Sequence, residues 1–282
     1  MEFTYTRYGA AITMFKVRIC QRFLLYCLCK LQIMKATIDN FSSQAGDYAR
    51  YRPHYPERLY AFVLAQVPGY NRAWDCGTGN GQVAVRLAQS FREVYATDIS
   101  QKQLAHAIQK PNIQYMVARA EESGLPDQSV QLITIAQALH WFDLEHFYRE
   151  VIRVSAPGAV VAAWCYSLLK ISKELDEPIE HFYKQTLGDY WDKERQLIDD
   201  AYATIPFPFE EMESPAFEMR YTWNLEELAG YFNTWSSVQK YMKARQQNPV
   251  TQLINKLKTV WGDEAEKKEI SFPLHMRIGR VS

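Results

Sequence analysis

The chain has 282 residues, of which 48% are hydrophobic and 14% aromatic, so it can bury a sizeable core. Lysine plus arginine and aspartate plus glutamate number 32 each, which leaves no positive excess for nucleic acid. The five cysteines are odd in number and lack the paired spacing of zinc sites. We therefore expect a cytoplasmic globular protein without a nucleic-acid, membrane or metal partner.

The first 33 residues differ from the patterned region that follows them. Their apolar run, Phe23 to Cys29, is interrupted by Lys30 and precedes no small-residue cleavage site, unlike a signal peptide. The run is also far shorter than the roughly 20 apolar residues of a membrane span. Met34 stands just before the patterned region. We expect residues 1–33 to be a dispensable extension and residues 34–282 to form one domain.

From Asn40 onward, helical and strand patterns alternate. A helix over 56–67 places Leu59, Phe62 and Val63 on one face. The next expected elements are strand 72–76, helix 81–91, strand 93–98, helix 101–109, strands 112–117 and 129–137, helix 144–154 and strand 158–166. Such alternation predicts parallel strands joined by right-handed crossovers, with ligands at the carboxyl ends of the strands.

After Ser167 this alternation stops. Helical stretches over 174–187 and 190–203 precede a strand over 216–223, and helices over 225–261 precede a last strand over 269–281. We interpret the helical parts, about 168–212 and 225–262, as a cap on a core formed by residues 41–166 and 215–282.

Three glycines alternate with other residues where the strand over 72–76 meets the next helix, in Asp75-Cys-Gly77-Thr-Gly79-Asn-Gly81. Missing side chains let the chain turn tightly and let a ligand approach the backbone. The segment from Gly79 to Ala84 also satisfies the dinucleotide fingerprint, and Asp98, ending the next strand, could hold a ribose.

Two alternatives to the preferred interpretation below therefore stay open. One is an NAD(P)-dependent reductase, for which Tyr166-x-x-x-Lys170 imitates a catalytic pair. That pair follows a strand directly, and the glycine loop lacks the spacing of that reductase family, which favours a chance match. The other alternative is a cofactor-binding protein without catalytic activity.

Several motifs, in this order, resemble those of the class I, seven-stranded S-adenosylmethionine-dependent methyltransferases. They are the glycine loop DCGTGNG, the strand VYATD, the loop ARAEESGLP, the segment AQALHWFD and the turn in SAPGAVVAAW. The resemblance implies S-adenosylmethionine as cofactor and a Rossmann-like α/β fold. That fold is a doubly wound, mostly parallel seven-stranded sheet with an α-helical cap insertion before the last strands.

The resemblance also implies roles for individual residues. Asp75 would lie near the amino group of the cofactor's methionine moiety, Asp98 would bind both ribose hydroxyls, and Ile99 would contact the adenine. Arg119 stands where many relatives have an aspartate, so the candidates for the adenine amino group are Ala120 and Glu121. The full set of cofactor candidates is Asp75, Gly77, Gly79, Gly81, Asp98, Ile99, Ala120, Glu121 and Gln137.

Within this class, the segments FSSQAGDYARYRPHYP, ALHWF and NTWSSVQKY resemble the trans-aconitate methyltransferase-like branch. This implies a small, often carboxylated methyl acceptor, with Tyr48, Arg52 and Trp141 as candidates to bind it. His140 is the catalytic candidate. It is either a general base titrating near the ordinary histidine pKa of about 6.5 or a hydrogen-bonded wall residue. We predict O-methylation of a carboxylate by a monomer or homodimer.

Overall fold

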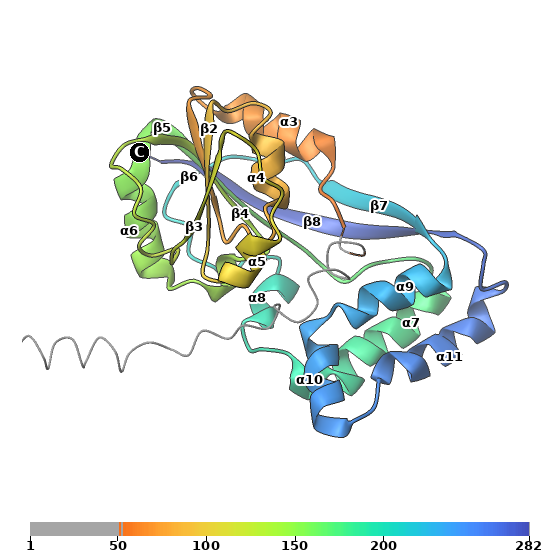
Figure 1. Ribbon diagram of the computed structural model, residues 1–282. Helices are drawn as coiled ribbons and strands as arrows, with labels where there is room; N and C mark the ends of the chain where they lie inside the picture. Colours follow the sequence, from red (N-terminus) through yellow and green to blue (C-terminus); the bar gives the residue numbers. More distant parts are fainter. Residues whose placement is uncertain (1–50, 52, 282) are drawn as a thin grey trace, which may run out of the picture. The chain divides into compact units, whose positions relative to one another are not determined.

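The computed structural model describes residue 51 and residues 53–281, which all belong to one compact unit (Figure 1). The predicted extension 1–33 and the substrate candidates Tyr48 and Arg52 lie outside the described residues. Within the described part, no helix is both long enough and apolar enough to cross a membrane.

A central sheet contains five parallel strands in the order β3-β2-β1-β4-β5. They are β1 (Arg72–Cys76), β2 (Glu93–Asp98), β3 (Ile113–Val117), β4 (Val130–Ala136) and β5 (Ser155–Tyr166). The long strand β8 (Lys268–Arg280) runs antiparallel to β5 and also pairs with β7 (Phe217–Trp223) and β6 (Glu210–Glu211). The predicted fold class is confirmed, and the two-residue β6 adds a strand that the sequence did not indicate.

Helices cover both faces of this sheet because successive residues of each strand point to opposite sides. In β4, Leu132 belongs to one hydrophobic cluster and Ile133 to the other, and both are fully buried. Helix α3 (Glu57–Gln66) precedes β1, and the α-helices between the parallel strands are α4 (Gln82–Leu87), α5 (Gln101–Ala105) and α6 (Leu144–Val154). The helices expected over 81–91 and 101–109 are thus shorter than predicted.

The remaining helices interrupt the antiparallel part of the sheet. Between β5 and β6 lie α7 (Lys173–His181), a π-helical turn (Phe182–Thr186), the short helix η3 (Gly188–Tyr190) and α8 (Arg195–Asp199). Between β7 and β8 lie α9 (Leu225–Asn233), α10 (Ser236–Arg245) and α11 (Pro249–Trp261). Figure 1 shows α7, α9, α10 and α11 gathered beside the long strands β7 and β8, and α11 packs against both α7 and α9.

The helix expected over 190–203 is wrong in extent, since within it only α8 is an α-helix. Ala201 and Tyr202 have φ angles of 54° and 59°, which is the left-handed region and cannot continue a right-handed helix. Nη1 of Arg277 on β8 donates to the carbonyl oxygens of Tyr202 and Ile205 at 3.0 Å each. This distant arginine therefore satisfies carbonyl groups that a longer helix would have paired locally.

Candidate functional site

The glycine loop connects β1 to α4 at the carboxyl ends of the parallel strands. Gly77, Gly79 and Gly81 have φ angles of 69°, 57° and 82°. A Cβ atom at Gly77 would lie 2.6 Å from Cβ of Ala138, and one at Gly81 would collide with the phenol of Tyr115. A Cβ atom at Gly79 would meet nothing within 4 Å. Gly77 and Gly81 thus permit close packing, whereas Gly79 leaves the backbone of the loop open to a ligand.

Asp75 holds this loop in shape from inside the protein. Asp75 is only 1% exposed. The carboxylate accepts hydrogen bonds from Thr78 Oγ1 at 2.5 Å, Thr134 Oγ1 at 2.8 Å and the Ala84 backbone N–H at 3.2 Å. Burial raises its pKa to about 6, although these hydrogen bonds oppose the increase. The observed contacts of Asp75 are therefore structural, and a contact with a cofactor's amino group stays a prediction.

Asp98 lies at the end of β2, next to the open glycine. Its Oδ2 accepts from the Gly79 N–H and its Oδ1 from the Ser100 N–H, both at 2.8 Å. A carboxylate can accept about four hydrogen bonds, and its two oxygens match two neighbouring hydroxyls. Beside it, Ile99 is 50% exposed, which is a high value for a large apolar side chain. The pair offers a polar group and an apolar surface to one ligand.

The two candidates for contact with adenine, Ala120 and Glu121, differ in their burial and their contacts. Ala120 is buried. The Glu121 carboxylate accepts from the Asp143 N–H at 2.9 Å and lies 3.2 Å from Nε of Arg119. Glu121 thus links its own loop to the start of α6. Its proposed contact with adenine remains a prediction.

Gln137 follows β4 and carries a polar atom without a partner. Its φ angle is 55°, and its backbone N–H donates to the Trp164 carbonyl oxygen at 2.9 Å. Its Oε1 and the Trp164 Nε1 are buried, and neither has a hydrogen-bond partner in the described part of the chain. A buried polar atom left unpaired costs about 1–3 kcal/mol. Such atoms at the strand ends fit a site whose ligand supplies the missing partners.

His140 lies in the short helix η1 (Leu139–Trp141) just after β4 and is 7% exposed. Its Nδ1 is 3.0 Å from the Tyr202 hydroxyl oxygen. Burial, helped by the positive charge of Arg195, lowers the pKa of His140 to about 3. This does not fit the general-base alternative, which needs a titration near 6.5, and it leaves the imidazole neutral at neutral pH.

The burial of His140 predicts how stability depends on pH. In the unfolded chain His140 binds a proton below about pH 6.5. The folded protein resists protonation of this histidine until about pH 3, so acidification favours unfolding. Between pH 7.5 and 5.0, His140 should remove about 2 kcal/mol from the free energy of unfolding.

Urea denaturation at the two pH values measures this loss. We expect a smaller loss in His140→Gln than in the natural chain. His146→Gln is the matched control because the His146 side chain is 57% exposed. An equal loss of unfolding free energy in all three proteins would contradict the lowered pKa of His140.

Of the substrate candidates, only Trp141 is described. It is 39% exposed, and its ring centroid lies 4.8 Å from that of His140. The described neighbours of Arg52 contact two different parts of the fold. The Tyr51 ring lies over Gly230 of α9, and the Tyr55 ring meets Trp164 of β5 edge-on with centroids 5.5 Å apart.

Sequence reasoning missed four residues that organise this site. Thr78 and Thr134 bind Asp75, while Tyr202 and Arg195 act on His140. Thr78 lies inside the glycine motif and Thr134 on the neighbouring strand, so a polar residue in the apolar pattern of β4 was a usable signal. Tyr202 and Arg195 come from a distant segment, and no local pattern pointed to them.

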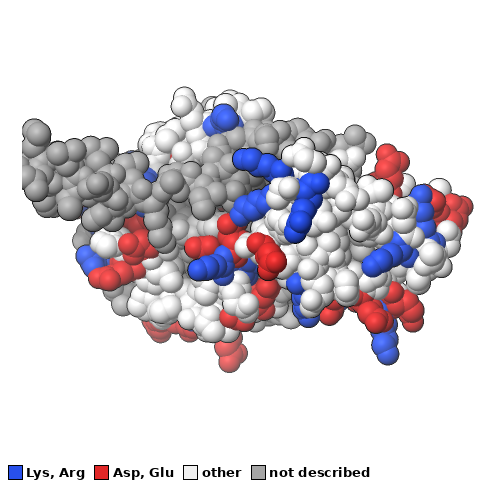
Figure 2. Space-filling view, turned by 90° about the horizontal axis from the view of Figure 1, so that it is seen from below, with Lys and Arg blue, Asp and Glu red and all other residues white. Residues whose placement is uncertain are grey.

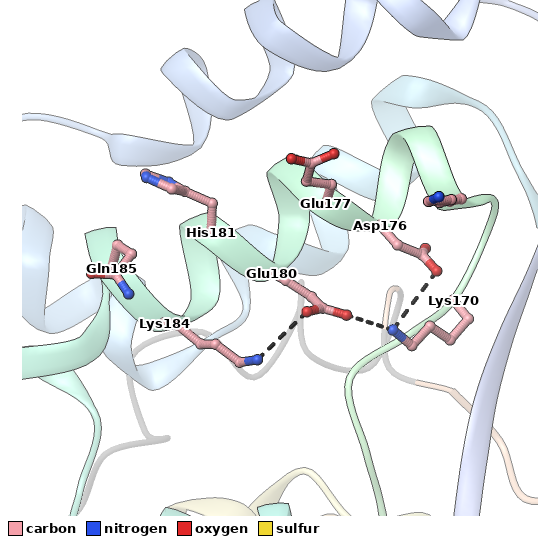
Figure 3. A pocket seen from close by; sticks show the side chains of 8 residues that line it. Lys170, Asp176, Glu177, Glu180, His181, Lys184 and Gln185 are labelled. Carbon is pink, nitrogen blue, oxygen red and sulfur yellow. Dashed lines mark hydrogen bonds and ion pairs between the residues drawn. The ribbon is translucent and has the colours of Figure 1, made fainter.

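The charged side chains on one face of the described part of the protein form no patch of a single sign (Figure 2). On the face seen in Figure 2, positive and negative side chains are interspersed over the described atoms. A hollow of about 630 Å³ lies along α7, and charged residues line it (Figure 3). Within it, Nζ of Lys170 is 2.7 Å from Glu180 and 3.7 Å from Asp176. Lys170 is thus held by two carboxylates, which argues against the catalytic pair of a reductase.

Comparison with known proteins gives the family. A model of the methyltransferase domain matches residues 74–163, which span β1 to β5. A methyltransferase-type protein of Dictyostelium discoideum is 33% identical over 250 residues, covering 86% of this chain and 95% of that protein. A Schizosaccharomyces pombe protein described as an uncharacterized methyltransferase is 24% identical and covers 78% of this chain and 88% of its own length.

A solved structure agrees with this result. It is described as a type II methyltransferase from Anaeromyxobacter dehalogenans, is 36% identical and superimposes with a TM-score of 0.76. The match covers 82% of this chain and 98% of that one. The open Gly79, the carboxylate of Asp98 and the unpaired Oε1 of Gln137 also fit the cofactor of such enzymes. The chain belongs to the class I S-adenosylmethionine-dependent methyltransferases.

Proposed function

We propose that the protein methylates a carboxylate oxygen of a small organic acid, as the trans-aconitate methyltransferase-like branch does. The state of His140 carries this proposal, because its ring is buried, its Nδ1 is engaged by Tyr202 and its pKa is about 3. A phenol, an amine or a carbon acid must lose a proton to act as the nucleophile, and His140 is a poor base for that step. A carboxylate is already ionised near neutral pH.

The cofactor supplies a methyl group that its sulfonium has already activated. The chain has to position the acceptor and exclude water. In this proposal Asp98 binds the ribose hydroxyls, Ile99 contacts the adenine and Gln137 Oε1 accepts from the methionine end. His140 stays neutral and acts as a hydrogen-bonding wall residue beside Trp141. Tyr48 and Arg52 contact the acceptor, in a monomer or homodimer in the cytoplasm.

Replacing Asp98 by alanine tests the cofactor part of the proposal. The change removes a charged acceptor from two hydroxyls, so affinity for S-adenosylhomocysteine should fall by about tenfold to a hundredfold. Isothermal titration calorimetry measures the affinity. Asp98→Asn keeps one acceptor oxygen and should lose less. Unchanged binding by Asp98→Ala would remove this carboxylate from the cofactor site.

Methyl transfer to a panel of small molecules tests the acceptor. The full chain is incubated with S-adenosylmethionine labelled in its methyl group and with small carboxylic acids, their neutral amides, phenols and amines. We expect label in the acids but not in the amides. The product should release volatile labelled methanol in mild alkali, because a methyl ester is hydrolysed there.

Two results would contradict the proposal. Label that survives alkali, or transfer to phenols or amines while acids stay unlabelled, would show a different acceptor atom. Binding of S-adenosylhomocysteine without transfer to any member of the panel would favour a protein that binds the cofactor without catalysis.

A further inference from the structure

Arg195, the first residue of α8, is held in place by aromatic rings. The carbon of its guanidinium lies 4.9 Å from the ring centroid of Trp191 and 5.3 Å from that of Tyr183. Its Nε donates to the Tyr183 hydroxyl at 2.6 Å and lies 3.6 Å from Oδ1 of Asp199. These contacts restrain the plane of the guanidinium and use its Nε.

The other edge of this guanidinium is unused. Neither terminal nitrogen of Arg195 has a hydrogen-bond partner among residues 51 and 53–281, and its side chain is 21% exposed. Two terminal nitrogens in one plane match the two oxygens of a carboxylate. Because the rings have already restrained the side chain, little conformational entropy is left to lose when an anion binds.

The charge of Arg195 acts on the end of the sheet where the candidate site lies. It contributes to lowering the pKa of His140, which follows β4, and also acts on Cys165 near the end of β5. Tyr202, which bonds to His140, interacts with the same charge. The shortest approach of Asp199 to this guanidinium is at Nε, 3.6 Å away, and the same Oδ1 accepts from the Tyr183 hydroxyl at 2.7 Å. Figure 1 shows α8 next to the carboxyl ends of the parallel strands.

We infer that Arg195 binds a carboxylate of the methyl acceptor through its two terminal nitrogens. This inference rests on the proposed function, in which the acceptor is an acid. A guanidinium that donates hydrogen bonds to both oxygens of one carboxylate makes those oxygens poorer nucleophiles. The acceptor therefore carries a second carboxylate, which is the one that is methylated, and the favoured substrates are acids with two or more carboxylates.

Calorimetric titration of the full chain, saturated with S-adenosylhomocysteine, tests this binding. The probes are succinate, citrate and, as the neutral analogue, succinamide. We expect the natural chain to bind the acids and not the amide. Arg195→Gln should weaken acid binding by about tenfold to a hundredfold, and Arg195→Lys should weaken it less because charge remains without the planar fork.

Controls separate this effect from general damage. Arg149→Gln changes an exposed arginine that pairs with Glu145 on α6, and it should leave acid binding unchanged. Affinity for S-adenosylhomocysteine should be the same in Arg195→Gln as in the natural chain. Unchanged acid affinity in a folded Arg195→Gln would overturn the inference, as would failure of the natural chain to bind either acid.

If the variants do not fold, the natural chain still gives an answer. Phenylglyoxal modifies accessible arginines, and peptide mass spectrometry measures its reaction at Arg195. Succinate or citrate should slow that reaction and succinamide should not. Equal reaction rates with and without the acids would overturn the inference.

Kinetics distinguish a failure here from a failure of the proposed function. If acids are methylated, Arg195→Gln should raise KM about tenfold to a hundredfold and change kcat much less. Methylation of acids with an unchanged KM would overturn the role of Arg195 alone. Acid binding that depends on Arg195, together with methyl transfer only to phenols or amines, would overturn the proposed acceptor and support the anion site.

Discussion

Gly79→Val is expected to lower affinity for S-adenosylhomocysteine by more than about a hundredfold, because backbone strain and occlusion of the ligand's place act together. Gly79 has a φ angle of 57°, which a β-branched residue adopts only at a high cost. The open space in front of this glycine would be filled by the valine side chain. Calorimetry with S-adenosylhomocysteine and a circular dichroism spectrum of the same sample measure binding and folding together.

Two further variants make this result interpretable. Gly79→Ala adds a single methyl group and should weaken binding less than valine does. Gly69→Val is the matched control, because Gly69 also has open space around it and does not need a positive φ angle. A folded Gly79→Val protein that binds normally would refute the idea that the cofactor lies against this loop.

Asp75→Ala is expected to lower the free energy of unfolding by about 3 kcal/mol or more. The change leaves the hydroxyls of Thr78 and Thr134 and the Ala84 N–H without their acceptor in a buried place. Because these groups shape the glycine loop, cofactor affinity should fall as well. Urea denaturation measures the free energy of unfolding, and calorimetry measures the cofactor affinity.

The pH dependence of stability in Asp75→Asn tests whether the buried Asp75 carboxylate causes the loss. Asp75→Asn keeps the size of the side chain and one acceptor oxygen, so it should lose less stability than alanine. The raised pKa of Asp75, about 6, means that its ionisation in the folded protein is unfavourable. Ionisation of Asp75 therefore removes stability from the natural chain as pH rises from about 4 to 7, and the asparagine variant lacks this contribution. The free energy of unfolding of Asp75→Asn should therefore approach that of the natural chain as pH rises from about 4 to 7. A difference that widens over this range would contradict the raised pKa of Asp75.

Local patterns sufficed for the parallel part of the sheet. The strands expected over 72–76 and 93–98 coincide with β1 and β2, and the long helix over 144–154 coincides with α6. These elements have the apolar spacing that burial requires, and Asp143 caps α6 by accepting from the His146 N–H. Where periodicity and end signals agree, neighbours in sequence determine the element.

The segment over 190–203 shows where local patterns fail. Its spacing suggested one helix, but Arg277, on a strand 75 positions from Tyr202, binds the carbonyl oxygen of Tyr202. The left-handed turn at Ala201 and Tyr202 brings the Tyr202 hydroxyl to His140. A contact over this sequence distance depends on the packing of the whole sheet, so no window of residues contains it.

By itself the sequence determined the order of the parallel strands and of the helices among them, the glycine loop and the position of Asp98 at the end of a strand. Each of these follows from spacing between near neighbours. Only the tertiary structure decided that Asp75 is enclosed by Thr78 and Thr134, and that His140 is buried against Tyr202 under the charge of Arg195. The protonation state of a side chain depends on burial and on charges brought from other segments, and the folded chain alone supplies both.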